Sequence, residues 1–514
     1  MPKQVFKPYN KDQITFLPID LGTIIPENHM VRVIDKAIDK MDTAPLLKTY
    51  KGGGTSAYHP VMLLKVLVYA YADKIFSSRQ IAKATRENIN FIWLTGNVQL
   101  DFMTVNRFRS QRLNGIIEKI FAEVVELLTR EKYITLEKYF LDGTKIESAA
   151  NKYSWVWGKN TQRFKKQLNE KVVKLFREID ILNDKEDSAY DGNDLPETGC
   201  KPIDSGAIEE AVKRIDEKLT DNPGNKALKK ARTVIEKNYL PRMSKYEKQE
   251  EILKERRSFS KTDNDATFMR MKEDHMKNGQ LKPGYNVQMG TENQFITGYS
   301  IHQTTADTIC TKEHLESLNF KPKEVIADAG YGSEENYEYF EEKDIKAYVK
   351  YNTFHKEKSS KWIKDITKAQ NFKYNQEEDR YYCPANNRPM VFIREENQKS
   401  KNGYISRIRI YECLNCNGCP YREKCVKGEE DFANRRLYIN PKLNRYKAKA
   451  NELLLSEKGI EMRAKRPVEV ESVFGDIKGN FGLRRFTLRG LQKVKIEYGL
   501  WSIAHNMRKM VRAI

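Results

Sequence analysis

The sequence predicts an α/β protein with a mixed sheet, an all-α N-terminal domain and two insertions. Three observations predict it. Apolar residues recur at helical spacing over residues 12–130. Strand-like runs then alternate with a helix, which is the order of an α/β core. Two segments break this order, the first charged and helix-prone and the second short, polar and rich in cysteine.

These observations divide the 514-residue chain, which is too long for one ordinary core. We expect a helical domain at residues 1–130 and an α/β domain at 131–514. The second domain would be interrupted by a helical insertion at 155–257 and a Cys-rich insertion at 350–440. Within the core we expect strands over 284–289, 295–301, 324–328 and 345–349, and a helix over 307–318.

The bulk composition points to a polyanionic partner. The formal net charge is +20, and a surplus this large favours nucleic acid. The N-terminus lacks the apolar stretch of a signal peptide, and no run approaches the roughly 18 apolar residues that span a bilayer. We therefore expect a cytoplasmic protein without a membrane partner. Seven cysteines, an odd number in a large chain, do not resemble a secreted disulfide framework.

Short helices are predicted along the N-terminal region. Pro60 suits the first position of a helix with one apolar face, and Gly96 suits the end of another. Thr104 is placed to cap a helix that contains Arg107, Arg109 and Arg112. A helix rich in Arg, Asn and Gln after a short helix and a turn suits DNA recognition. The alternative is a helical bundle whose arginines only face water.

Two predicted strands end in an aspartate. One ends at Asp142, where Gly143 is expected to allow a tight turn into the next strand, and another ends at Asp328. Functional groups collect at strand ends in α/β sheets. A third acid, Glu471, lies on a late helix with Pro467 near its start. Three such carboxylates can hold two Mg²⁺ or Mn²⁺ ions about 3.5–4 Å apart.

The order of three motifs resembles the DDE-type insertion-sequence transposases of bacteria and archaea. The motifs are Tyr139-Phe-Leu-Asp142-Gly-Thr, Val325-Ile-Ala-Asp328-Ala-Gly-Tyr and Val470-Glu471-Ser-Val-Phe-Gly-Asp-Ile-Lys478. Further similarity lies in Tyr285-Asn-Val-Gln288, in Asp12-Gln13 with Phe16-Leu17-Pro18, in Ile25-Pro-Glu-Asn-His29 and in Thr104-Val-Asn-Arg107-Phe-Arg109. The resemblance covers most of the chain and implies an RNase H-like catalytic core.

The resemblance also implies roles for the acids. Asp142 would bridge two metal ions, while Asp328 and Glu471 would each complete the ligands of one ion. Glu469 and Asp476 are neighbouring alternatives for the third acid, and the position of Glu471 before Ser-Val-Phe-Gly favours Glu471.

Two basic residues resemble those that flank the glutamate in related transposases. Arg466 and Lys478 would grip phosphates beside the scissile bond. The related sequences usually place the arginine four residues before the glutamate, whereas Arg466 lies five residues before it.

The cysteines predict a structural zinc site. Two overlapping C-x₂-C steps lie within Cys413–Cys425, and Cys383 lies upstream. Five thiols compete for four places: we expect Cys383, Cys416, Cys419 and Cys425, with Cys413 in reserve. The alternative is a cluster of reduced cysteines without a metal.

Taken together, the resemblance implies a DNA transposase acting at the nucleoid. It would bind the terminal inverted repeats of its element as a homodimer on double-stranded DNA. It would then hydrolyse one strand and join the freed 3′-hydroxyl to target DNA. Two alternatives remain at this point, a DNA-binding regulator derived from a transposase and a metal-dependent nuclease that cuts without joining.

Overall fold

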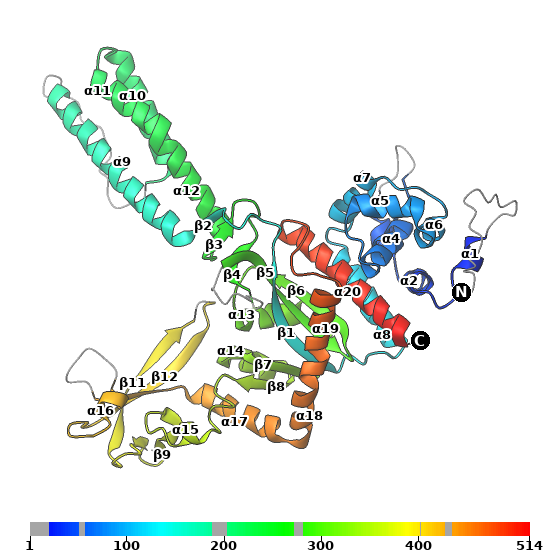
Figure 1. Ribbon diagram of the computed structural model, residues 1–514. Helices are drawn as coiled ribbons and strands as arrows, with labels where there is room; N and C mark the ends of the chain where they lie inside the picture. The colour runs from blue at the N-terminus through cyan, green and yellow to red at the C-terminus, as the bar shows by residue number, and fades with distance from the viewer. Residues whose placement is uncertain are drawn as a thin grey trace, which may run out of the picture. The chain divides into compact units, whose positions relative to one another are not determined.

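The computed structural model describes residues 20–50, 57–187, 203–271, 281–400, 402–426 and 434–513 (Figure 1). The motif at residues 12–18 lies outside this part of the chain. The described residues form two compact units, one built from the chain before residue 135 and after residue 495, the other from residues 135–495. Within these described ranges, no helix is both long enough and apolar enough to cross a bilayer.

The first unit is helical. Its elements are α1 (Leu21–Ile24), α2 (Met30–Asp39), α3 (Ala44–Leu47), α4 (Pro60–Ala72), α5 (Ser78–Glu87), α6 (Ile89–Thr95), α7 (Phe102–Arg107), the π-turn η1 (Phe108–Arg112), α8 (Ile117–Arg130) and most of α20 (Leu491–Ala513). The Trp501 ring of α20 packs in this unit, with centroids 4.3 Å from Phe76 and 5.7 Å from Tyr71.

Local signals in this unit are confirmed in part. Pro60 begins α4 as predicted, but the helix is buried around nearly its whole circumference rather than on one face. Gly96 ends α6 with a φ of 59°, as predicted. The cap of α7 is Asp101, whose carboxylate accepts from the Met103 amide at 2.7 Å. The expectation for Thr104 is therefore wrong, because an acid three residues earlier already satisfies the first amides.

The second unit is built on a mixed sheet with the strand order β6-β5-β1-β7-β8, and β4 also pairs with β5, on the edge away from β1. The antiparallel strands are β1, β5 and β6, while β7 and β8 run parallel to β1. Their bounds are β1 (Lys138–Glu147), β4 (Thr267–Arg270), β5 (Leu281–Glu292), β6 (Phe295–His302), β7 (Glu324–Gly332) and β8 (Lys346–Tyr351). This confirms the predicted mixed α/β core and fits the RNase H-like fold.

The strand β1 runs straight through Asp142 and Gly143, so the expected turn at Gly143 is wrong. Gly143 instead lies opposite Gln288 of β5. A Cβ atom at Gly143 would lie 2.4 Å from Gln288 Nε2 and 2.8 Å from Asp307 Oδ1. Glycine is therefore needed here for close approach and not for a turn.

The strand β7 also continues past its aspartate. It extends from Asp328 to Gly332, with a register shift against β8 between Ala327 and Gly332. Ser333 then caps α14 (Glu334–Glu342) by accepting from the Asn336 amide. The irregular segment lets the chain leave the ladder immediately beside Asp328.

Helices pack on the sheet. They are α13 (Asp307–Glu316), α14, α17 (Pro441–Leu455) and a continuous run made of α18 (Glu457–Arg466), η4 (Pro467–Glu471), α19 (Ser472–Gly475) and η5 (Asp476–Asn480). Of these, α13 contacts the strands β5, β6 and β7. Pro467 lies inside this run and not near its start, which corrects the expectation. A proline lacks the amide hydrogen that a regular helix uses, and the run widens into the π-turn η4 at this residue.

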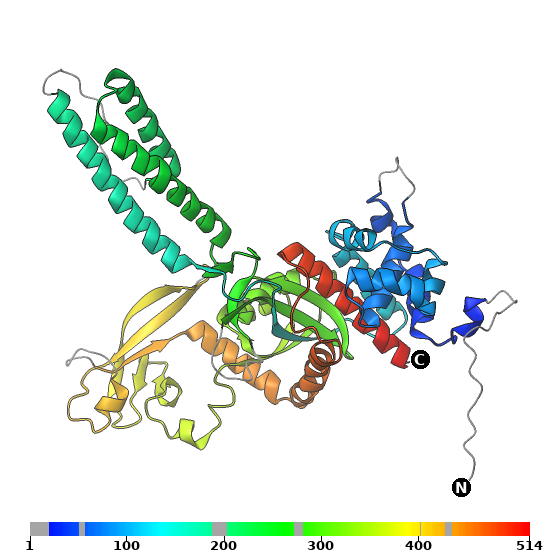
Figure 2. The same cartoon turned by 45° about the horizontal axis from the view of Figure 1, so that its top comes forward.

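The helical insertion is an antiparallel helix assembly (Figure 1, Figure 2). It comprises β2 (Trp155–Trp157), α9 (Gly158–Asp187), α10 (Ser205–Asp221), α11 (Lys226–Val234), η2 (Ile235–Tyr239), α12 (Leu240–Leu253) and β3 (Ser258–Ser260). The start of α9 pairs with the end of α12, since Lys165 lies 2.6 Å from Glu250. Leu168, Val172 and Ile208 belong to its apolar core.

The Cys-rich insertion contains an antiparallel sheet of order β13-β12-β11-β10-β9. Its elements are α15 (Ser360–Ile363), η3 (Ala369–Asn371), β9 (Lys373–Asn375), β10 (Arg380–Tyr382), β11 (Pro389–Lys399), β12 (Ile405–Cys413), α16 (Arg422–Cys425) and β13 (Arg436–Ile439). A small core that includes Phe372, Met390 and Tyr411 stabilises it.

Candidate active site

Two aspartates from neighbouring strands share one arginine. The Arg466 Nη2 atom lies 3.1 Å from Asp142 Oδ2 and 3.7 Å from Asp328 Oδ2. The side chains of Asp142 and Arg466 are each 12% exposed, whereas that of Asp328 is 43% exposed. Because β1 and β7 are adjacent and parallel, residues far apart in sequence converge here. The pair is open to solvent on the Asp328 side.

The chemistry of this pair suits a divalent cation. Two carboxylate oxygens already face a single cationic nitrogen, and carboxylates are preferred ligands of Mg²⁺ and Mn²⁺. The third expected ligand does not complete a closed group: among the described residues, no three His, Cys, Asp or Glu side chains are arranged to hold one ion. The structure thus brings Asp142 and Asp328 together without Glu471.

Glu471 ends η4, which packs against β1 and β5. Its side chain is exposed and makes no hydrogen bond or ion pair within the described chain. Glu469 differs, because its Oε2 atom accepts from the Gln294 amide at 2.6 Å. Gln294 and Asn293 both have positive φ in the β5–β6 turn, so Glu469 stabilises that turn.

The π-turn η4 gives a physical reason for the five-residue spacing between Arg466 and Glu471. In a regular α-helix, residues five apart point about 140° away from each other. A π-turn bonds residues five apart instead of four and so absorbs one extra residue. It therefore brings Arg466 and Glu471 nearer to one face of the helix. Lys478 lies partly buried on the second π-turn, η5.

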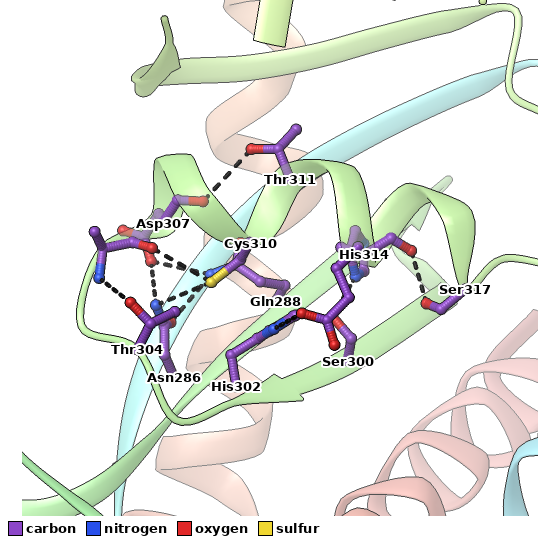
Figure 3. A network of polar contacts seen from close by, with 12 residues as sticks. Asn286, Gln288, Ser300, His302, Thr304, Asp307, Cys310, Thr311, His314 and Ser317 are labelled. Atoms are coloured by element: carbon purple, nitrogen blue, oxygen red, sulfur yellow. Dashed lines mark hydrogen bonds and ion pairs between the residues drawn. The ribbon is translucent and has the colours of Figure 1, made fainter. Parts of the chain in front are cut away.

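A hydrogen-bond network that the sequence did not reveal joins β5 to the start of α13 (Figure 3). Its residue Gln288 lies opposite Gly143, the residue that follows Asp142 in β1. Gln288 and Asn286 donate to Asp307 Oδ1 at 3.0 and 2.8 Å. The Tyr331 hydroxyl donates to Gln288 Oε1 at 2.5 Å. Burial, reinforced by Asp142, Asp307 and Asp328, raises the pKa of Tyr331 well above its usual value. The Tyr285-Asn-Val-Gln288 motif was the available signal for this network.

A second chain of hydrogen bonds joins α13 to the sheet. Tyr139 Oη lies 2.7 Å from His314 Nε2, and Ser300 Oγ lies 2.6 Å from both His314 Nδ1 and His302 Nε2. His302 Nδ1 lies 3.1 Å from Glu313 Oε2. With both imidazoles neutral, every donor can have one acceptor. Burial, with a smaller contribution from His302, lowers the pKa of His314 to about 3.

Lys350 of β8 is a further cationic residue near the pair. Burial lowers its pKa, the charges of Arg466 and Arg463 lower it further, and Asp328 opposes the shift. Nothing in the local sequence pattern around Lys350 marks it as a site residue, so its place here was not predictable from the sequence.

The three arginines predicted to contact DNA differ in exposure. Arg107 and Arg112 are exposed, although Arg112 donates to the Thr49 carbonyl at 2.6 Å. Arg109 is only 4% exposed and donates to the Phe76 carbonyl at 2.7 Å. We therefore correct the expectation for Arg109, whose guanidinium holds the helical unit together.

All five clustered cysteines line one small cavity in the Cys-rich insertion, namely Cys383, Cys413, Cys416, Cys419 and Cys425. Burial raises the pKa of Cys413 to about 11 and also raises that of Cys425, where Arg435 opposes the shift. No three of the described thiols are arranged to hold a metal ion. The structure thus brings the reserve residue, Cys413, to the same cavity as the other four.

Two family models match the chain. A transposase DDE domain matches residues 382–511, the region that contains Glu471, and a transposase domain (DUF772) matches residues 19–111 in the helical unit. Neither the curated proteins nor the solved structures gave a match. With one transposase domain near each end of the chain, and a mixed α/β core between them, the protein is a DDE-type insertion-sequence transposase.

Proposed function

We propose that this transposase cleaves DNA at the ends of its mobile element and joins the freed 3′-hydroxyl to target DNA, with Asp142, Asp328 and Glu471 as metal ligands. The observation that carries the proposal is that the carboxylates of Asp142 and Asp328 converge on the guanidinium of Arg466. The exposed, unpaired carboxylate of Glu471, on a helix that packs on the same sheet, supports its role as the third ligand.

The protein's own groups would hold and orient the reactants. Bound divalent ions supply activation of the attacking oxygen and stabilisation of the leaving oxygen. Asp142 and Asp328 bind these ions, and Arg466 turns from the carboxylates to a phosphate oxygen of the substrate. Lys350 adds a second positive charge beside Asp328, which favours the approach of the DNA backbone.

Recognition of the terminal inverted repeats is assigned to the helical unit. The exposed side chains of Arg107 and Arg112 are the candidates for contact with DNA. Two element ends must be held together for transposition, so the active form is proposed to be a homodimer on DNA.

The test is cleavage of a labelled duplex carrying the terminal repeat, with Mg²⁺ or Mn²⁺ present. We expect cleavage by the wild type, loss of cleavage in Asp328→Asn with binding retained, and normal cleavage in Asp221→Asn, an exposed aspartate at the end of α10. Equal cleavage by wild type and Asp328→Asn would overturn the assignment. Binding without cleavage by wild type would favour the regulator, and cleavage without joining would favour the nuclease.

We also propose that the Cys-rich insertion holds a structural Zn²⁺ ion. The support is a set of five thiols on one cavity, since thiolates are preferred zinc ligands. Cys383, Cys416, Cys419 and Cys425 are the proposed set. Zinc content by elemental analysis should be one per chain, should fall in Cys419→Ser and should persist in Cys310→Ser. Retention of zinc in Cys383→Ser and its loss in Cys413→Ser would exchange these two ligands.

A further inference from the structure

One face of the helix α9 carries a row of basic side chains. Its members are Lys159, Arg163, Lys166, Lys174 and Arg177, all exposed, and we call them the basic stripe. At 3.6 residues per turn, the five fall within an arc of about 80° on the helix. Glu170 is the one acid in the same row.

The basic stripe points away from the helices that pack on α9. Leu168, Val172 and Ile179 lie on the opposite side and are buried against α10, α11 and α12. The stripe therefore has no role in holding the insertion together. Lys165, by contrast, lies off the stripe and helps to hold the insertion together, because it pairs with Glu250 of α12.

The stripe is also short of internal counter-charges. Lys174 has Glu178 at 4.0 Å, an exposed pair of little strength. Lys159, Arg163, Lys166 and Arg177 form no ion pair with any described residue. Within the described part of the chain, no acid neutralises these four charges, so a polyanion can take the place of solvent ions there.

The part of α9 that carries the stripe holds mostly one sign of charge, whereas residues 178–187 of the same helix hold one Lys and five Asp or Glu. Residues 158–177 hold seven Lys or Arg and one Glu, a net charge of +6. The neighbouring α10 holds three Lys or Arg and five Asp or Glu, a net charge of −2. Solvation alone is served by a mixture of signs on every helix. The concentration of one sign on an outward face instead indicates a polyanionic ligand.

The dimensions of the stripe suit duplex DNA. From Lys159 to Arg177 the helix rises about 27 Å, at 1.5 Å per residue. That length corresponds to about eight base pairs at 3.4 Å each along one strand. Lysine and arginine in a row bind phosphates and need no base edge, so the contact would be independent of sequence.

We propose that the basic stripe binds the phosphate backbone of duplex DNA as a second, sequence-independent DNA-binding surface. This rests on the proposed function, because it takes DNA as the substrate of the catalytic core. The stripe adds affinity for DNA of any sequence, while the helical unit selects the repeat.

The test compares the full-length wild type with a variant in which all five stripe residues are changed to Gln. Binding is measured by fluorescence anisotropy on a repeat duplex and on an unrelated duplex of equal length, from 50 to 300 mM KCl. Each lost phosphate contact reduces the slope of log K against log salt by about 0.9. We expect the magnitude of the slope to fall by about three to four on both duplexes.

A charge-matched control carries the same change at five exposed residues elsewhere on the insertion, Lys213, Arg214, Lys229, Lys245 and Lys248. Its slope should remain that of the wild type, and thermal melting should show that both variants are folded. Equal slopes for wild type and stripe variant would overturn the proposal, and strong wild-type binding to repeat DNA would then leave the proposed function standing. Absence of DNA binding by wild type would overturn both.

Discussion

The guanidinium of Arg466 lies 3.1 Å from the carboxylate of Asp142, and the same nitrogen lies 3.7 Å from Asp328. One internal cation therefore neutralises the two acids proposed to bind metal. Any divalent ion that enters must compete with this arginine, so metal affinity and the resting position of Arg466 are coupled.

Replacing Arg466 by Gln should show separately how Arg466 stabilises the metal-free protein and how it competes with a divalent ion. Without the guanidinium, the two carboxylates repel each other, and the metal-free protein should lose about 1–3 kcal/mol of stability. Mn²⁺ should bind about tenfold more tightly, a change of about 1.4 kcal/mol. Mn²⁺ binding followed by electron paramagnetic resonance without DNA measures this directly. An unchanged affinity would show that Arg466 does not compete with the ion.

Gly143→Ala should damage the site without touching a carboxylate. The new methyl group would lie 2.4 Å from Gln288 Nε2 and 2.8 Å from Asp307 Oδ1, so these two buried side chains must shift and lose their mutual hydrogen bond. We expect a loss of about 1–3 kcal/mol in unfolding free energy, as in overpacked cores, and reduced cleavage. Gly479→Ala is the matched control, because nothing lies within 4 Å of its Cβ position. Similar denaturation midpoints for the two variants would contradict the close packing.

Deleting Val468 should convert the π-turn η4 into a regular helical turn. Val468 is 59% exposed, so little packing is lost. Arg466 would then precede the glutamate by four residues and remain on the same face, and cleavage should be retained. Deletion of the exposed Glu452 from the regular helix α17 should instead rotate the following residues by about 100° and destabilise the protein. Loss of cleavage on deleting Val468 would show that the wide turn itself is required.

The buried His314 should make stability depend on pH. Its pKa is lowered to about 3 in the folded protein by burial, from an ordinary value of 6.5. Between these values the unfolded chain binds a proton that the folded chain does not, so stability rises with pH and is lost as pH falls below about 6.5.

His314→Gln removes this contribution. The difference in unfolding free energy between wild type and variant should therefore change by up to about 1.4 kcal/mol per pH unit from pH 6 to pH 4. Urea titrations at several pH values measure it, with the exposed His59→Gln as control. Parallel curves for wild type and His314→Gln would refute the assignment.

The strands were predictable from local pattern, because each is a short apolar run. The helix α13 was also predicted from the sequence, although Ala306 gives it no side-chain cap. The roles of Gly143 and Arg109 were not. The need for glycine at position 143 comes from the close approach of Asp307, which lies in a distant segment of the chain. The buried position of the Arg109 side chain comes from its hydrogen bond to the carbonyl of Phe76 on another loop. In both cases the deciding neighbour is distant in sequence, and residue type alone suggested a turn and a DNA contact.

The spacing of Arg466 and Glu471 was visible in the sequence, but its cause was not. A helix that widens at Pro467 tolerates an extra residue without moving the acid off its face. The gain or loss of one codon at this place is therefore a small step for the gene. Transposases whose arginine precedes the glutamate by four or by five positions can be neighbouring outcomes of one lineage, separated by a single in-frame insertion.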